Sequence, residues 1–422
     1  MKILTLSNLY PPDFIGGYEL ACAHVVDAFR ERGHDVRVLT ATPRQPIPRS
    51  PEHVLRRFRL VDEWSEDGMG SASLAYRLDE AESRLVSAHN VHVLTSVLDE
   101  FAPDVVYICC VTGLGGFALV ACLQYMKIPW VWQLGDRVPF HLCSTRETVI
   151  EGLARAFSSR IRGNYIVVSE QLRREIEDAG IHLNGRVQVL PNWITGTRRM
   201  VERSYYKGGH LRIMSAGQVA RWKGSDLLIV AAANLRELGH DDFSIDFYGR
   251  VHQPDLVLLA SKLGLTRHVS FKGVLPHRQL LDAYRDYDVF AFPTILREPF
   301  GLVPLEAMAR GCVPVLTRKC GIAEYLVHGV HGLKAERDAH SFARAFAAVM
   351  RGEVDLEAMG RRGMVMAWRD FHIDSILPSI ERQLVQASLQ SRAGAGTAKE
   401  AYRLARLAEQ VGANLIQETI VA

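Results

Sequence analysis

The chain has 422 residues, of which 48% are hydrophobic and 23% are charged, the composition of an ordinary folded globular protein. Fifty Lys and Arg against 47 Asp and Glu leave a formal net charge of +3, far from the basic stripe that nucleic-acid binding needs. The composition excludes disordered, collagen-like and disulfide-scaffold proteins, and the near balance of charges predicts no nucleic-acid partner. At roughly 100–200 residues per domain, the length predicts two or three domains, with cores that need no disulfide or metal staple.

The cysteines and the N-terminus favour a cytoplasmic protein. The seven cysteines form no CxxC motif and no group with zinc-ligand spacing, and they stand mainly in apolar contexts. We therefore expect reduced, buried thiols and no metal site. The first residues run directly into a strand-like segment without a signal-peptide pattern.

Residues 2–7 predict a strand, 17–32 an amphipathic helix and 35–40 a second strand, which together form a βαβ unit. Residues 45–70, rich in Arg, Pro and acids, predict an extended insertion without an assigned role. Further strands are expected at 104–109, 130–134, 164–168 and 187–190.

The uncharged stretch 105–126 is long enough to span a bilayer. Its β-rich start and its glycines at 113, 115 and 116 favour instead a buried strand, a turn and a packed helix.

The alternation of strands and helices then restarts after a break at 191–196, which a polar stretch at 198–210 follows. The second series of strands is expected at 212–216, 244–248, 268–271, 289–292 and 313–317. Alternation of this kind predicts an α/β protein with two facing Rossmann-like domains and parallel sheets, and a cleft between them as the default ligand site.

We expect an N-terminal domain over 1–195 and a second domain over 196–371. A linker and a tail helix over 391–422 follow, with the helix at about 398–412.

The most informative segment is 297–311, where Phe300, Gly301 and Leu302 precede a predicted helix. Pro304 suits the first turn of that helix and Gly311 its C-terminal end. Backbone N–H groups in front of a helix can hold an anion such as a diphosphate, and Gly301 lets the backbone approach closely.

Two glutamates flank this loop, Glu298 before it and Glu306 on the predicted first turn of the helix. Carboxylates beside a diphosphate would repel it unless they accept hydrogen bonds from sugar hydroxyls. Each glutamate alone could equally be a salt-bridged or dipole-complementing residue, whereas the combination with the glycine loop favours function.

A second candidate segment is 217–226, which follows a strand and opens a helix. Arg221 and Lys223 could neutralise phosphate oxygens there, or they could belong to a solvated basic loop. Gly16 and Gly17, in the first strand-to-helix turn, could contact a phosphate or simply form a tight turn, because the G-x-G-x-x-G spacing is missing.

These segments resemble the retaining GT-B glycosyltransferases of family 4 over most of residues 1–385. The resemblance is carried by the Glu298-x7-Glu306 block together with PP…GG…E at 11–19, RGHDV at 32–36, VSE at 168–170, VLPN at 189–192, WKGSD at 222–226 and VSFKGV at 269–274.

The resemblance implies that the domain over 1–195 binds the acceptor and is completed by C-terminal helices at 372–390, and that the domain over 196–371 binds the nucleotide sugar. It also implies that Glu298 contacts the hydroxyls of the donor sugar and that Glu306 holds the ribose. It implies that Lys223 and the amides of Phe300, Gly301 and Leu302 hold the diphosphate or sugar. The backbone near Val274 and Leu275 would recognise the base.

Three positions depart from the family pattern. Gln218 stands where Arg is usual, so that Arg221 is a candidate for the missing charge. Gly135 stands where a His commonly faces the donor sugar, and Asp136 after it is a candidate for positioning sugar or acceptor, or a structural partner of Arg137. Gly249-Arg250 replaces a commoner glycine-x-glycine.

The implied reaction moves a hexosyl group from a nucleoside-diphosphate sugar to an acceptor hydroxyl, with retention of the anomeric configuration. The acceptor is a glycan, a lipid-linked compound or a small molecule. The reaction needs no metal and no further cofactor, because cations and loop amides stabilise the leaving diphosphate. A non-catalytic sugar-nucleotide-binding subunit is the alternative. A dinucleotide-dependent oxidoreductase is disfavoured by the missing glycine fingerprint.

Peripheral contact with the inner face of a membrane is a minority hypothesis. It rests on two arginine clusters, 56–59 and 155–162, which more often are solvated faces.

Overall fold

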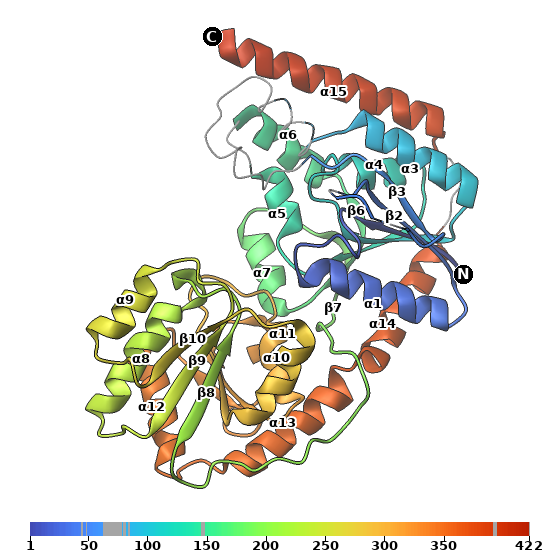
Figure 1. Ribbon diagram of the computed structural model, residues 1–422. Coiled ribbons are helices and arrows are strands. Elements are labelled where there is room, and N and C mark those ends of the chain that lie inside the picture. Colours follow the sequence, from blue (N-terminus) through green and yellow to red (C-terminus); the bar gives the residue numbers. More distant parts are fainter. Residues whose placement is uncertain are drawn as a thin grey trace. The chain divides into compact units, whose positions relative to one another are not determined.

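The computed structural model describes residues 1–43, 45–47, 49–61, 78, 82, 85–144, 148–390 and 395–421. Residues 48 and 62–70 of the predicted insertion, and 391–394 and 422 of the predicted linker and tail, lie outside this description. Figure 1 shows two compact units. Unit 1 comprises Met1–Val168, Leu172–Leu190 and Leu377–Ala422, and unit 2 comprises Ser169–Gln171 and Pro191–Ile376.

Within the described residues, unit 1 is built on a seven-stranded parallel sheet with the strand order β3-β2-β1-β4-β5-β6-β7. Its strands are β1 (Lys2–Ser7), β2 (Asp35–Ala41), β3 (Val54–Phe58), β4 (Val105–Cys110), β5 (Trp130–Leu134), β6 (Arg162–Val167) and β7 (Asn184–Val189). The predicted strands are confirmed with shifts of up to three residues, whereas the edge strand β3 lies within the segment predicted to be an insertion.

The uncharged stretch 105–126 is a strand, a turn and a helix, as predicted. Every residue of β4 is buried, and Gly113 and Gly115 have positive φ values of 77° and 101° in the turn before α4 (Ala118–Tyr125). No helix in the described part of the chain combines the length and the apolarity needed to cross a bilayer. All seven cysteines are free and buried, as predicted, and burial raises the pKa of Cys110 to about 11.

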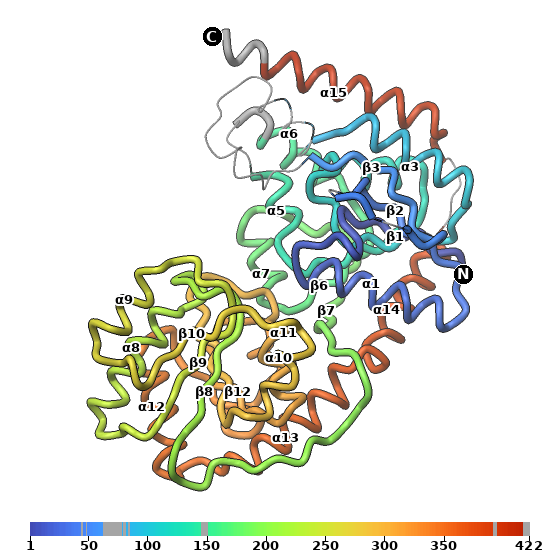
Figure 2. Tube along the Cα trace, in the orientation of Figure 1, coloured from blue at the N-terminus to red at the C-terminus, as the bar shows by residue number. Residues whose placement is uncertain are grey.

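Helices surround the sheet of unit 1. They are α1 (Gly17–Glu31), α3 (Ala88–Phe101), α4, α5 (Val138–Cys143), α6 (Thr148–Ser158), α7 (Glu170–Asp178), α14 (Ile373–Ser388) and α15 (Ala398–Val421). The path of the chain, including the return of α14 and α15, can be followed in Figure 2. Glu381 of α14 lies 2.8 Å from both Arg32 and His34, which joins this helix to the turn between α1 and β2.

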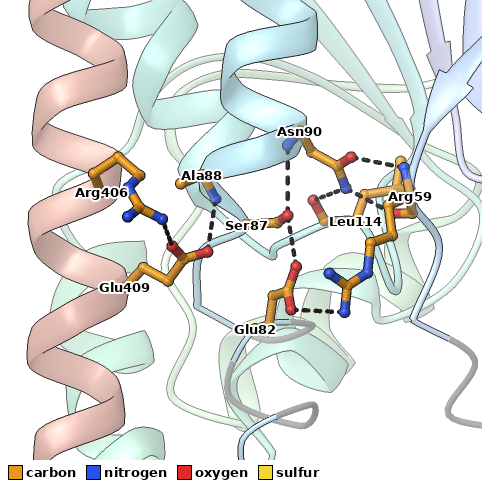
Figure 3. A network of polar contacts seen from close by, with 8 residues as sticks. All are labelled: Arg59, Glu82, Ser87, Ala88, Asn90, Leu114, Arg406 and Glu409. Carbon is orange, nitrogen blue, oxygen red and sulfur yellow. Dashed lines mark hydrogen bonds and ion pairs between the residues drawn. The ribbon is translucent and has the colours of Figure 1, made fainter.

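Helix α15 is nine residues longer than predicted and packs along α3 (Figure 1). Figure 3 shows how its polar side chains contribute: Glu409 Oε1 accepts a hydrogen bond of 3.2 Å from the backbone N–H of Ala88, in the first turn of α3. Arg406 holds the same carboxylate at 3.1 Å. Ser87 caps α3 by accepting from Asn90 N–H. A carboxylate at a helix N-terminus stabilises the helix, so α15 supplies part of the cap of α3.

Unit 2 contains, in its described residues, a six-stranded parallel sheet with the order β10-β9-β8-β11-β12-β13. The strands are β8 (Leu211–Ala216), β9 (Phe243–Tyr248), β10 (Val269–Gly273), β11 (Val289–Phe292), β12 (Val313–Thr317) and β13 (Leu333–Ala335). The first five were predicted to within two residues, and the three-residue edge strand β13 was not.

One face of this sheet packs against α8 (Ser225–Glu237), α9 (Asp255–Lys262) and α12 (Ala339–Met350). The helices α10 (His277–Ala283), α11 (Leu302–Met308) and α13 (Leu356–Asp370) belong to the other side (Figure 1). Short 3-10 turns complete the unit: η2 (Arg221–Lys223), η3 (Tyr284–Asp286) and η4 (Gly321–Glu324). Parallel sheets between helices confirm the predicted α/β class.

We expect Glu409→Ala to loosen the α15–α3 contact, because the substitution removes the acceptor for Ala88 N–H and the partner of Arg406. A lost cap costs about 1 kcal/mol, so amide hydrogen exchange in α15 and in the first turn of α3 should accelerate roughly five-fold. The matched control is Gln410→Ala, at the exposed next position of α15. Equal exchange in the two variants would contradict the capping role.

Candidate functional site

The candidate site of unit 2 lies at the carboxyl edge of its sheet, where β8, β9, β10 and β11 end. Because neighbouring parallel strands end at the same edge, the loop after β8 meets the loop after β11. Lys223 comes from the first loop and Glu298 from the second, and Lys223 Nζ lies 2.8 Å from Glu298 Oε2. The side chains are 35% and 16% exposed, so the ion pair is accessible from solvent. Two residues predicted from separate motifs therefore meet in the fold.

Close backbone approaches hold both loops in place. A Cβ atom at Gly224, where φ is +77°, would lie 2.1 Å from the carbonyl oxygen of Pro293, so only glycine allows η2 to pack there. A Cβ atom at Gly321 would lie 2.0 Å from the carbonyl oxygen of Pro299. The N–H of Gly321 donates to Glu298 O at 3.0 Å, and Ile322 N–H donates to Phe300 O at 2.7 Å. The backbone of the Glu298 loop is thus clamped against η4.

Phe300 and Gly301 lie in front of a helix, as predicted, whereas Leu302, predicted in the same loop, is the first residue of that helix. Phe300 is buried, and Gly301 has φ +102° at the N-cap of α11. Pro304 lies in the first turn, as predicted. Glu306 is the fifth residue of α11 and so lies just past the first turn, in which it was predicted, because α11 begins at Leu302.

Glu306 has its own ionisable partner. His277 Nε2 lies 2.8 Å from Glu306 Oε1, and the hydroxyl of buried Tyr284 lies 3.5 Å from Glu306 Oε2. The hydrogen bond to Glu306 raises the pKa of His277 above its usual value of 6.5, and burial and Arg310 oppose this rise. His277 was not predicted as a site residue, since one His after a Pro carries no motif of its own.

Val274 and Leu275 lie in the loop between β10 and α10, directly before His277. The side chain of Val274 is 71% exposed. The residues proposed for base recognition and His277, the partner of Glu306, thus lie within four positions of one another in the chain.

Arg221 and Gln218 are engaged elsewhere in unit 2. The Arg221 guanidinium contacts Asp226 at 3.3 Å and also pairs with Asp255 of α9. The amide oxygen of Gln218 accepts a hydrogen bond of 3.2 Å from Trp222 Nε1. The Lys223 ammonium is therefore the cation that the structure brings to Glu298.

Three predicted residues belong to unit 1. Gly16 is the N-cap of α1, and its N–H donates to Glu19 Oε2 at 3.0 Å, while Gly17 is the first residue of that helix. Asp136 follows β5, where its Oδ1 accepts from Arg137 N–H at 2.5 Å and lies 3.8 Å from His141 Nε2.

Tyr18 explains the glycine at position 135. Its hydroxyl donates to Gln133 O at 2.7 Å and accepts from Gly135 N–H at 2.8 Å, so it bridges the end of β5. A Cβ atom at Gly135 would lie 2.8 Å from the Tyr18 ring. Tyr18 occupies the space that a larger residue at 135 would need, and burial raises the pKa of its hydroxyl well above 10.

Family comparisons cover most of the chain. Residues 15–197 match the family model described as Glycosyltransferase Family 4, and residues 202–365 match the model described as Glycosyl transferases group 1. The chain is 25% identical over 382 residues to glycogen synthase of Mycobacterium tuberculosis, which covers 88% of this chain and 91% of that protein. It is 33% identical over 152 residues to D-inositol 3-phosphate glycosyltransferase of Corynebacterium urealyticum, 34% of this chain and 35% of that protein.

Solved structures share the fold. Anabaena Alr3699/HepE in complex with UDP has a TM-score of 0.64 and 17% identity, covering 92% of this chain and 100% of that one. Sucrose-phosphate synthase from Thermosynechococcus elongatus has a TM-score of 0.65 and 17% identity, covering 91% and 98%.

We expect Gly135→Ala to lower the free energy of unfolding of unit 1 by about 1–3 kcal/mol, because the partly buried Tyr18 ring is held in place by its two backbone hydrogen bonds. The matched control is Gly152→Ala in α6, where a Cβ atom would meet nothing within 4 Å; it should be neutral or slightly stabilising. Urea unfolding followed by tryptophan fluorescence measures both. Equal stability of the two variants would refute the packing argument.

Proposed function

The chain belongs to the group 1 and family 4 glycosyltransferases and has their GT-B fold, and we propose that it is a retaining hexosyltransferase that uses a nucleoside-diphosphate sugar. The observation that carries this proposal is the meeting of Lys223 and Glu298 at 2.8 Å, beside the Phe300–Leu302 loop. A cation, a hydroxyl-binding carboxylate and loop amides are the groups that a nucleotide sugar requires. A relative of the same fold was solved with UDP and glucose, which supports this class of donor.

In the proposed complex the donor replaces the internal ion pair. The diphosphate takes the Lys223 ammonium, and the hydroxyls of the hexose donate to Glu298. The amides of Phe300, Gly301 and Leu302 face the diphosphate or the sugar, Glu306 accepts from the ribose hydroxyls, and the backbone at Val274 and Leu275 meets the base. Each partner of the donor thus comes from the carboxyl edge of one sheet.

The reaction breaks the bond between the anomeric carbon and the β-phosphate oxygen, and the electron pair leaves with the diphosphate. The acceptor hydroxyl forms the new bond on the same face, and its proton passes to the departing phosphate. Most of the activation free energy comes from the negative charge that develops on the leaving diphosphate. Lys223 and the loop amides stabilise that charge, so the proposal needs no divalent metal. Arg221 contributes only if its guanidinium exchanges Asp255 for phosphate.

The residues of unit 1 are proposed to serve the acceptor. Asp136, with His141 at 3.8 Å, is the candidate for positioning an acceptor hydroxyl or the sugar, and Gly16 and Gly17 leave the start of α1 without bulk. The acceptor is a glycan, a lipid-linked hydroxyl compound or a small molecule. For a lipid-linked acceptor, the protein would work at the inner face of a membrane.

A second candidate function is a sugar-nucleotide-binding subunit without turnover. The observation that favours it is the Tyr18–Gly135 pair, which fills the place where the resembling family carries a His. Tight binding of a nucleotide sugar without release of nucleoside diphosphate, across a panel of acceptors, would establish this alternative.

We expect Lys223→Ala and Glu298→Gln to lower turnover of the nucleotide sugar by about 10²–10³-fold, the effect of removing one preorganised charge-stabilising group. The assay follows nucleoside diphosphate released from UDP-glucose, ADP-glucose and GDP-glucose. Lys262→Ala, on the exposed end of α9, is the matched control and should keep wild-type turnover. Full activity of a folded Lys223→Ala variant would contradict the assignment of Lys223 to the donor site.

A further inference from the structure

We propose that His277 is a donor-positioning residue: through its hydrogen bond to Glu306 it orients the carboxylate that receives the ribose and so helps the site discriminate ribose from deoxyribose. The inference rests on the proposed function, since it assigns a role toward the same donor. His277 does not need to touch the chemistry, because it acts through Glu306.

The geometry carries this inference. His277 Nε2 is 2.8 Å from Oε1 of Glu306, whereas the Tyr284 hydroxyl is 3.5 Å from Oε2. The two oxygens are thus held unequally: the short contact fixes Oε1, and the long one leaves Oε2 weakly held. A carboxylate has about four lone-pair sites, so it can keep His277 and still accept hydroxyl protons from a ribose.

Exposure agrees with this division of roles. The side chain of Glu306 is 17% exposed, and that of His277 is 65% exposed. A mostly exposed imidazole therefore rests on a mostly covered carboxylate, at the rim where Val274 and Leu275 precede it in the chain.

The surroundings determine the sign of any pH dependence. The groups that face His277 are Glu306 and Arg310, both from the α11 segment, and Tyr284 contacts Glu306 from η3. The Glu306 contact holds the pKa of His277 above 6.5. Below that pKa the imidazolium makes a charge-assisted hydrogen bond and adds a positive charge toward an anionic donor. Donor affinity should therefore fall as the pH rises through the pKa of His277.

The test is the binding of a nucleotide sugar to the full chain, measured by calorimetry. The probe is UDP-glucose, ADP-glucose or GDP-glucose, whichever the wild type binds most tightly, together with its 2′-deoxyribose analogue. Nucleotide sugars are preferred to free nucleoside diphosphates because a terminal phosphate itself titrates near pH 6.

We expect His277→Ala to reduce the preference for ribose over 2′-deoxyribose by about three- to ten-fold, the net contribution of one hydrogen bond of ordinary strength, because His277 acts on the ribose only through Glu306. His277→Gln, whose amide can still donate to Glu306, should keep most of that preference but lose the pH dependence between pH 6 and 8. His340→Gln replaces an exposed histidine of α12 and is the matched control, with wild-type preference and pH profile.

The outcomes separate the two claims. If Glu306→Gln abolishes the ribose preference while His277→Ala retains it, the role of His277 is wrong and the proposed function stands. If the wild type binds none of the three nucleotide sugars, that result contradicts both the proposed function and the role of His277. Circular dichroism of each variant confirms that a loss of preference is not a loss of fold.

Discussion

The candidate site depends on a balance of charge at one sheet edge. Glu298 and Glu306 are each held at 2.8 Å by a basic side chain, Lys223 and His277 respectively. Two carboxylates without such partners would repel both each other and a diphosphate. In the proposed complex the donor replaces the Lys223–Glu298 pair, with phosphate oxygens on Lys223 and sugar hydroxyls on Glu298, whereas Glu306 keeps His277 while it accepts from the ribose.

The backbone is arranged to keep this balance in position. Glycines at 224 and 321 allow approaches near 2 Å between a notional Cβ and a carbonyl oxygen, which no other residue permits. The buried side chain of Phe300 anchors the loop that carries Glu298. The site is therefore built on clamped loops at the carboxyl ends of the central strands, the edge at which parallel α/β sheets bind ligands.

Much of this architecture could be predicted from the sequence, because buried parallel strands are continuous β-rich runs. The edge strands β3 and β13 could not, since they are short or lie inside a charged, Pro-containing segment. Lys223 and Glu298 could be named from their motifs, but the partners of Arg221 and Glu306 could not. Asp255 and His277 reach them through tertiary packing, which leaves no local pattern. Glu306 falls just past the first turn of α11, because the helix starts at Leu302, which was expected to belong to the preceding loop.

Two departures from the family pattern have local compensations. Gln218 hydrogen-bonds Trp222, so this position is satisfied without the usual Arg. Gly135 makes room for Tyr18, whose hydroxyl satisfies two backbone groups at the end of β5. The proposed donor edge of unit 2 thus keeps its charged groups, whereas the surroundings of β5 in unit 1 differ from the pattern.

Amide hydrogen exchange of the full chain, with and without saturating UDP-glucose, ADP-glucose or GDP-glucose, tests the central claim most directly. We expect the donor that binds to slow exchange at residues 298–306 and 221–225, in the two loops that carry Glu298 and Lys223. Slowed exchange confined to other segments, with these loops unchanged at saturation, would contradict it.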